Sequence, residues 1–253
     1  MIEYDSFIYL DVYRTGSSHV LGLLPFITQE KCVKAHRHAA LTKAHPLGFV
    51  AGKRVFTTVR NPWDWYVSLW AYGCGGKSAI RRYLAAHLGE RELASLYDRR
   101  EPAPAFRRWL YLMHDPAILQ QVMKEHLPQS GLAPAIGLYT YRFLRVTTRW
   151  PSVVLRRTLI ANPVDALRHH QRFRAYHEVL RNESLDDDLA GFVRRNPKGF
   201  RPEAATIIGK ASISRQNASD RTLAAYRDYY DDKSAGLIGT RDQFFSAAFG
   251  YRF

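Results

Sequence analysis

Residues 7–26 of the chain read FIYLDVYRTGSSHVLGLLPF. Residues 7–12 form an apolar run of the length of a buried strand, and residues 18–26 form a longer apolar run typical of a helix. The loop between them contains an arginine, a glycine and hydroxyl side chains. A strand, a short polar loop and a helix make the first unit of an open α/β sheet, so this stretch predicts an α/β fold.

The loop also predicts an anion-binding site. Ligands of open α/β sheets bind at the carboxyl ends of the strands, where unpaired amides at the start of a helix attract negative charge. Gly16 lets the backbone turn toward the anion, and Arg14 adds a charged fork. Further donors come from the hydroxyls of Thr15, Ser17 and Ser18. We expect a phosphate or sulfate here; the alternative is a plain turn before a helix capped by a hydroxyl.

A second anion site is indicated by VFTTVRNPWDWYVSLW, which begins at residue 55. The β-branched residues 54–59 predict another strand. Asn61 is a good N-cap and Pro62 a good first helical residue, so a helix is expected to begin there. Arg60 ends the strand and Ser68 lies about two helical turns into the helix. Together they are candidates for holding a second phosphate, which suggests a nucleotide phosphorylated at both ends.

The rest of the chain predicts a single three-layer α/β domain, residues 1–253, with a central, mostly parallel sheet flanked by helices. Residues 75–135 are expected to form a helical cap insertion over the site, because long connections in compact domains are usually functional. Further strands are expected at residues 31–36, 137–146 and 177–181. Further helices are expected from residue 39, within the cap at residues 78–88, 91–99, 105–114 and 117–126, and at residues 220–230 and 233–245.

Composition limits the classes of function. The formal charge of +14 favours an anionic ligand, but the arginines are dispersed and form no basic block of the nucleic-acid type. The apolar runs are far shorter than the roughly 20 residues of a membrane span. No transmembrane span is expected, whereas peripheral association with a membrane stays open. An acidic N-terminus without a secretory pattern predicts a cytoplasmic location. Two distant cysteines and no ligand-spaced cluster predict no metal site.

Five stretches in order resemble the sulfotransferases that use 3′-phosphoadenosine 5′-phosphosulfate (PAPS), in their carbohydrate-type and bacterial branch. The loop at residues 13–18 is similar to the family's 5′-phosphosulfate loop, and Arg60 with Ser68 to its 3′-phosphate motif. KAHRHAAL resembles the histidine segment and VLRNESLDDDL the arginine-x-glutamate-x-leucine strand end. QNAS with YRDYYDD and the C-terminal RDQFFSAAFGYRF resembles the late loop and terminus. The cap at residues 75–135 matches no family segment.

The resemblance implies a sulfuryl transfer from PAPS to an acceptor hydroxyl, with a saccharide or glycolipid as the expected acceptor, leaving 3′-phosphoadenosine 5′-phosphate (PAP). It implies donor binding by residues 14–18, Arg60 and Ser68, and closure of the site by Ser214, Arg215 and Asn217. The family most often has lysine at position 14. Arginine keeps the charge but gives up a proton far less readily, so Arg14 suits binding better than acid catalysis.

A base for the acceptor proton is the remaining catalytic requirement. His38 occupies the histidine position of the family segment and titrates near neutral pH. His36 lies two residues away, on the same face if the segment is a strand. Glu183 in the glutamate motif is the other candidate base. Two other functions stay open: an ATP-dependent P-loop-like kinase, which the missing Gly-Lys-Ser loop after the first strand disfavours, and a basic nucleic-acid-binding module.

Overall fold

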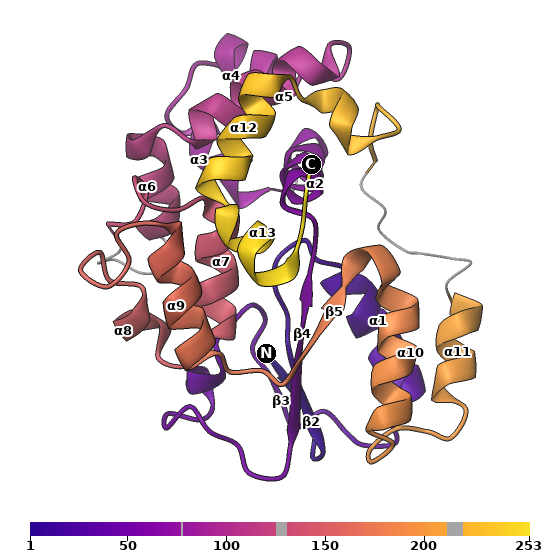
Figure 1. Ribbon diagram of the computed structural model, residues 1–253. Coiled ribbons are helices and arrows are strands. Elements are labelled where there is room, and N and C mark those ends of the chain that lie inside the picture. The colour runs from indigo at the N-terminus through magenta and orange to yellow at the C-terminus, as the bar shows by residue number, and fades with distance from the viewer. Residues whose placement is uncertain (77, 125–130, 212–219) are drawn as a thin grey trace. The chain divides into compact units, whose positions relative to one another are not determined.

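The computed structural model of the chain describes residues 1–76, 78–124, 131–211 and 220–253 (Figure 1). The chain folds into two compact units that alternate along the sequence. The first comprises Met1–Arg60, Arg142–Val154 and Arg168–Ala218, and the second comprises Asn61–Tyr141, Leu155–Leu167 and Ser219–Phe253. Among the described helices, none combines the length and the apolar character that a membrane crossing requires.

The first unit is built on a five-stranded sheet of order β3-β1-β2-β4-β5. The strands are β1 (Ile2–Glu3), β2 (Phe7–Leu10), β3 (Lys34–Ala35), β4 (Arg54–Val59) and β5 (Glu178–Arg181). β2, β4 and β5 run parallel, whereas β1 pairs antiparallel with β2 and with β3. The α/β class is confirmed, but the sheet is mixed and not mostly parallel. The missed strand β1 is joined to β2 by a short turn, a connection that only antiparallel neighbours can make.

The core of the first unit lies between this sheet and α1 (Ser17–Ile27), α10 (Leu185–Arg195) and α11 (Ala204–Ala211). Phe7 of β2 stacks on Phe200, with 4.6 Å between ring centroids, and Phe56 of β4 lies 4.4 Å from Phe192. Figure 1 shows these helices on one side of the strands. On the other side lie the carboxyl parts of α7 (Leu138–Thr147) and α9 (Pro163–Phe173), which belong to the same unit. Helices on both faces explain why every residue of β2 is buried.

The expectation of a strand at residues 137–146 is wrong, because this segment is α7. The apolar side chains of α7 include Leu138, Tyr139, Phe143 and Val146, all of which are buried. α7 is buried on nearly all sides, polar residues such as Thr140 and Arg142 included, and its aromatic residues favour a strand in sequence. The carboxyl part of α7, from Arg142 onward, belongs to the first unit.

The second unit is helical. Its helices include α2 (Pro62–Cys74), α3 (Ala79–Ala85), α4 (Glu90–Leu96), α5 (Pro102–Met113), α6 (Pro116–Lys124), α12 (Asp232–Arg241) and α13 (Gln243–Phe249). α2 begins as expected, because the Asn61 side chain accepts hydrogen bonds from the amides of Trp63 and Asp64. The indoles of Trp63, Trp65 and Trp70 are buried around this helix. The cap helices expected in sequence correspond to α3 through α6.

Three of the expected helices differ from the structure. Residues 220–230 contain only the short turn η4 (Tyr226–Tyr229), because the Tyr229 hydroxyl accepts from the amides of Thr222 and Leu223 and holds them outside a helix. The helix from residue 39 is reduced to η1 (Leu41–Lys43). The helix at residues 233–245 is split into α12 and α13 at Asp242.

Asp242 has a structural task that explains this break. Its Oδ1 accepts hydrogen bonds from the Thr140 amide (2.8 Å) and hydroxyl (2.7 Å), and its Oδ2 accepts one from the Tyr66 hydroxyl (2.7 Å). Asp242 therefore caps the start of α7 from another helix, where the dipole favours negative charge. Burial raises the pKa of Asp242, while these hydrogen bonds act in the opposite direction. A Cβ on Gly137 would lie 2.2 Å from the carboxylate, so the approach requires glycine.

Replacing this carboxylate should destabilise the second unit strongly. Asp242→Ala leaves the donors of Thr140 and Tyr66 buried without an acceptor, so we expect a loss of about 3 kcal/mol or more in urea unfolding. Asp232→Ala is the control: Asp232 is exposed in the first turn of α12, and its loss should cost less than about 1 kcal/mol. Equal effects of the two substitutions would contradict the capping role of Asp242.

Candidate functional site

The polar loop between β2 and α1 is held to the sheet by a chain of hydroxyl groups. The Thr15 hydroxyl donates to the Val12 carbonyl (3.0 Å) and shares a hydrogen bond with the Thr58 hydroxyl of β4 (2.6 Å). Thr58 in turn shares one with the Tyr9 hydroxyl (2.9 Å). The side chain of Thr15 is fully buried. Its hydroxyl is thus engaged inside the protein, which differs from its expected role as a donor to an anion.

Gly16 packs closely against the segment that follows β5. Its φ of 87° lies in the left-handed region. A Cβ here would lie 2.5 Å from Cδ2 of Leu185 and 2.8 Å from Oδ1 of Asn182. Asn182 belongs to the short turn η2 (Asn182–Ser184), so Gly16 brings the turn that carries Glu183 against the loop. Both the conformation and the packing therefore require glycine at position 16.

The start of α1 presents a site of positive potential. Gly16 is the N-cap residue and has no side chain with which to cap the helix, and the first turn carries no acidic residue. The first amides of a helix have no acceptor within the helix and lie at the positive end of its dipole. Ser17 is buried and Ser18 is exposed. The backbone amides at the start of α1 are therefore better suited to bind an anion than the hydroxyl side chains of the loop.

Arg14 and Arg60 meet at the carboxyl ends of adjacent parallel strands. Leu10 of β2 is paired with Thr57 of β4, so the residues that follow each strand lie at the same edge of the sheet. Nη1 of Arg60 donates to the backbone carbonyl of Arg14 (3.2 Å). Arg14 adopts a φ of 60°, an uncommon conformation for a residue with a side chain. Arg14 in the loop and Arg60, which contacts the loop, thus bring two guanidinium groups to this edge of the sheet.

The remaining expected residues have different surroundings. Ser68 lies on α2 in the second unit and is fully buried. Glu183 is exposed on η2. Ser214, Arg215 and Asn217 lie outside the described residues.

His38 is held in one orientation by Asp11. Its Nδ1 lies 2.9 Å from the Asp11 carbonyl oxygen, and its backbone amide donates to Asp11 Oδ1 (2.9 Å). A carbonyl oxygen only accepts, so Nδ1 carries the hydrogen and Nε2 keeps its lone pair. The ring also stacks on Tyr13, with 3.6 Å between centroids. His36 is exposed, and β3 ends before it, so the strand alternation expected for His36 and His38 is wrong.

Burial lowers the pKa of His38 below its ordinary value, and the nearby Arg37 acts in the same direction. The Asp11 carboxylate opposes this effect and raises the pKa. The net direction is downward, which keeps the imidazole neutral at neutral pH. A neutral ring with a lone pair at Nε2 can accept a proton.

Sequence reasoning missed four residues beside His38: Asp11, Tyr13, Arg142 and Arg145. Asp11 is a carboxylate at the end of a buried strand. Because a buried carboxylate requires cations or hydrogen-bond donors around it, its position could have indicated such neighbours in the sequence. The two arginines could not be placed, because their helix was interpreted as a strand. Arg142 and Arg145 lie 4.8 and 5.8 Å from the ring centroid of Tyr13. Nη2 of Arg145 also donates to the His38 carbonyl (3.2 Å).

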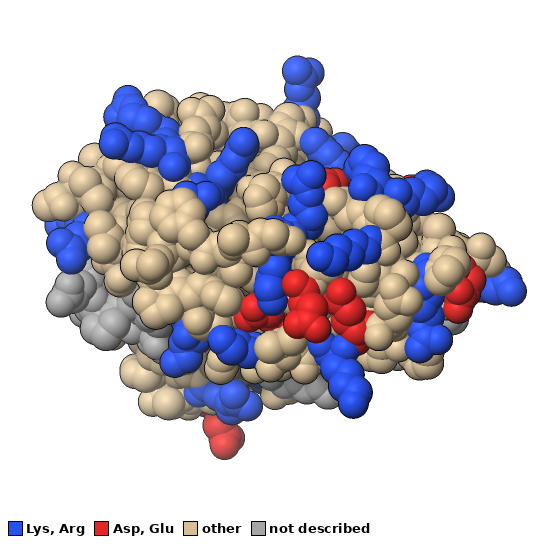
Figure 2. Space-filling view, turned by 90° about the horizontal axis from the view of Figure 1, so that it is seen from below, with Lys and Arg blue, Asp and Glu red and all other residues tan. Residues whose placement is uncertain are grey.

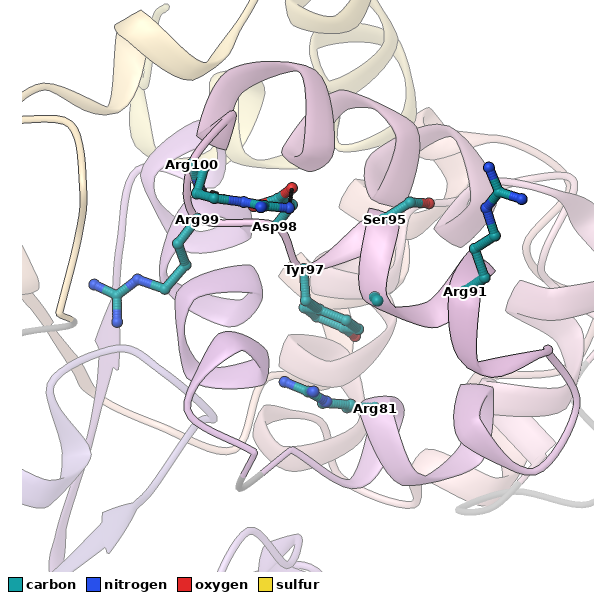
Figure 3. A pocket seen from close by; sticks show the side chains of 8 residues that line it. Arg81, Arg91, Ser95, Tyr97, Asp98, Arg99 and Arg100 are labelled. Atoms are coloured by element: carbon teal, nitrogen blue, oxygen red, sulfur yellow. Dashed lines mark hydrogen bonds and ion pairs between the residues drawn. The ribbon is translucent and has the colours of Figure 1, made fainter.

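A separate cavity of about 630 Å³ lies in the second unit (Figure 3). Its lining includes Arg81, Arg91, Tyr97, Asp98, Arg99 and Arg100. Arg81 lies over the Tyr97 ring and donates to the Gly73 carbonyl at the end of α2. Arg99 pairs with Asp220, and Arg100 pairs with Asp98. These ion pairs and hydrogen bonds stabilise the unit itself, so the arginine content of the lining is weak evidence for a ligand.

The charged surface agrees with the dispersed arginines of the sequence. On the face shown in Figure 2, Lys and Arg side chains are scattered among uncharged ones, and a small group of Asp and Glu lies between them. Among the described residues, no group of three or more His, Cys, Asp and Glu side chains has an arrangement that could hold a metal ion.

The glycine requirement at the loop can be tested by stability. Gly16→Ala forces a Cβ into Leu185 and Asn182 at a positive φ, so we expect a loss of about 2 kcal/mol or more in urea unfolding. Gly22→Ala in the same helix is the control, because nothing lies within 4 Å of its added Cβ. That substitution should leave stability unchanged or raise it by up to about 1 kcal/mol. A well-tolerated Gly16→Ala would contradict the close packing.

The state of His38 can be measured by NMR of the imidazole nitrogens, with His38→Gln used to assign the signals. We expect protonated Nδ1 and unprotonated Nε2 at pH 7, and a pKa below the ordinary 6.5 because burial disfavours the charged ring. The charge of the ring should therefore appear only as the pH falls below that value. An Nε2-protonated tautomer, or a pKa above 6.5, would refute this description of the site.

Comparison with known proteins adds no assignment. No protein-family model, no curated protein and no solved structure matches the chain. The arrangement at the carboxyl ends of β2 and β4 is therefore the basis on which a function can be argued.

Proposed function

We propose that the chain is a sulfotransferase that moves a sulfuryl group from PAPS to an acceptor hydroxyl. One observation carries the proposal: a loop turned by Gly16 at the start of α1 lies beside Arg60, the residue that follows the adjacent parallel strand β4. Helix amides and guanidinium groups at the carboxyl ends of neighbouring strands are the elements that recognise phosphate and sulfate. The resemblance in sequence suggests which phosphorylated nucleotide this is.

The residues present are compatible with such a donor. No side chain caps the first amides of α1 at Gly16, and no acidic residue lies in the first turn of the helix. Arg14 and the amides of residues 16–18 would hold the phosphosulfate, and Arg60 would hold the 3′-phosphate. When bound, the donor supplies a sulfuryl group on a phosphate leaving group. Arg14 stabilises negative charge on that phosphate without giving up a proton.

His38 is the proposed base. Its Nε2 takes the proton of the acceptor hydroxyl while that oxygen bonds to sulfur and the bond between sulfur and the phosphate oxygen breaks. Asp11 is a positioning residue, because it holds the imidazole through Nδ1 and leaves Nε2 available. Fixing the tautomer in this way is a recurring means of preparing a histidine for proton transfer.

His38 is preferred to the other two candidate bases on the basis of its surroundings. His36 and Glu183 are both exposed, whereas His38 is partly buried and bonded to Asp11. Glu183 nevertheless lies on the turn that contacts Gly16, so it stays a candidate for the same proton. We further propose a cytoplasmic protein and a saccharide as the bearer of the hydroxyl, both from the sequence and its resemblance.

Calorimetric titration with PAP tests the donor site without knowledge of the acceptor. PAP should bind more tightly than AMP, which lacks the 3′-phosphate. Arg60→Ala should weaken PAP binding by about 2 kcal/mol, roughly 30-fold, through loss of a charge-assisted hydrogen bond. It should change AMP binding much less, because AMP does not carry the group that Arg60 recognises.

The matched control is Arg54→Ala, which removes an equal charge from the exposed amino end of the same strand. It should leave both affinities within about twofold. Equal affinities of the unchanged protein for AMP and PAP would refute the proposed donor. Tighter binding of ATP than of PAP would favour the kinase alternative.

A further inference from the structure

Four apolar side chains lie together on the surface of the first unit. We call them the Phe49 patch, which consists of Leu47, Phe49, Trp150 and Val153. Leu47 is 79% exposed, Phe49 58% and Val153 47%, and Trp150 is partly exposed. Single exposed apolar residues are common on proteins, whereas a group of them in contact marks a surface that binds a partner or a membrane.

The patch is formed by two segments that are distant in sequence. Nε1 of Trp150 donates to the Pro46 carbonyl (3.3 Å), and the rings of Trp150 and Phe49 meet edge to face with 6.0 Å between centroids. The amide of Val153 donates to the Trp150 carbonyl (2.8 Å). A Cβ on Gly48, whose φ is 70°, would lie 3.4 Å from the indole. The loop that carries Phe49 therefore packs directly on Trp150.

The backbone of Trp150 adopts an unfavourable conformation. Its φ of 49° lies in the left-handed region, which is rare for a residue with a bulky side chain. Such a conformation persists only where the surrounding contacts hold it, and it is found most often at functional sites. The hydrogen bond to Pro46 is one of these contacts. The indole is thus held in place at the surface.

Arginine side chains border the patch. The Arg149 guanidinium lies over the Phe49 ring, 4.2 Å from its centroid. Arg172 lies over the ring of Phe173, and that ring meets Trp150 edge to face with 6.4 Å between centroids. Positive charge and exposed apolar surface therefore occur side by side in this part of the first unit.

The segments around the patch contain no acidic residue. Residues 31–60 include seven Lys and Arg but no Asp or Glu, and residues 142–154 and 168–177 include three arginines each, again without an acid. All three segments belong to the first unit. The carboxylate of Glu3 reaches the first of them, but it is buried and bonded to a histidine and a lysine there. An anionic surface would therefore meet little repulsion at the patch.

We propose that the Phe49 patch binds the surface of a bilayer that contains anionic phospholipids. The indole of Trp150 lies among the headgroups, Leu47 and Phe49 enter the boundary with the acyl chains, and Arg149 binds lipid phosphate. Binding removes apolar area from water and brings the cations to negative charge. This role is independent of the sulfuryl transfer proposed above.

The chemistry of the patch favours a lipid surface over two other occupants. A second copy of the chain, related by a twofold axis, would bring the same cations to the interface and repel the first. A nucleic acid would match the charge, but it binds through cations and stacked aromatic rings. The aliphatic side chains of Leu47 and Val153 would gain little from it. A bilayer matches both the charge and the aliphatic side chains.

Co-sedimentation of the full chain with vesicles tests the proposal. Vesicles of phosphatidylcholine and phosphatidylglycerol in equal amounts should bind the protein about tenfold or more tightly than vesicles of phosphatidylcholine alone, because only the first kind carries negative charge. Absence of binding to the charged vesicles, or equal binding to both kinds, would overturn the proposal.

Phe49→Ser separates insertion of the patch from general adsorption of a protein with a charge of +14. It removes no charge but should weaken binding to the charged vesicles about tenfold, since less apolar area leaves water. Leu47→Ser should act in the same direction. Phe26→Ser is the matched control, because Phe26 is 64% exposed on α1 and lies outside the patch. Equal losses in Phe49→Ser and Phe26→Ser would contradict a localised surface. The unfolding midpoint of each variant verifies that it is folded.

Arg149→Gln tests the cationic part of the patch. It should weaken binding to the charged vesicles about fivefold, which is the contribution of one arginine near an anionic surface. Arg91→Gln is the control, because Arg91 is exposed on α4 in the second unit. An equal loss in both variants would show that the total charge governs binding and would overturn the proposal.

Two further measurements test the other occupants. Sedimentation equilibrium should give the same oligomeric state for the unchanged protein and for Phe49→Ser. A dimer that dissociates in Phe49→Ser would assign the patch to a second copy of the chain and overturn the proposal. Binding of a DNA duplex should be equal in Phe49→Ser and Phe26→Ser. A selective loss in Phe49→Ser would assign the patch to nucleic acid and also overturn the proposal.

Discussion

The buried carboxylate of Asp11 is the constraint on which the candidate site depends. An ionised carboxylate without water is costly by several kcal/mol unless cations and donors surround it. At the end of β2 these partners are the Met1 amino group, Arg37 and the His38 amide. The segment after β3 is thereby tied to the end of β2, and the His38 ring is placed beside the loop. The position of His38 follows from satisfying this one charge, and the Asp11 backbone carbonyl then orients the imidazole through Nδ1.

In the loop between β2 and α1, the groups that position the backbone differ from the groups proposed to bind an anion. The groups that position it are buried and engaged with the protein: the hydroxyls of Tyr9, Thr15 and Thr58, and the contact of Gly16 with Asn182. The groups that would hold an anion in the proposed function are backbone amides at the start of α1 and the guanidinium groups of Arg14 and Arg60. Such a site is largely formed before any ligand arrives, which reduces the conformational entropy lost on binding.

The sequence predicted local elements well where one strong pattern was present. β2 with α1, and β4 with α2, were found because buried runs, Gly16 and the Asn61 cap act within a few residues. The predictions that failed concern features whose structure depends on partners distant in sequence. The strand β1 requires β2 and β3, and α7 was misread because its burial is not one-sided. The break at Asp242 arises from Thr140 and Tyr66, and the role of Thr15 from Thr58. The arginines beside Tyr13 were missed together with α7.

The burial of indoles around α2 has a spectroscopic consequence. Of the five tryptophans, Trp63, Trp65, Trp70 and Trp109 belong to the second unit, and Trp150 alone belongs to the first. Those four are buried, and Trp150 is partly exposed. Intrinsic fluorescence therefore reports mainly on the helical unit, while the sheet that carries the loop and His38 contributes a single indole. In a Trp150→Phe protein, tryptophan emission would report on the second unit alone, whereas far-ultraviolet circular dichroism would report on both units.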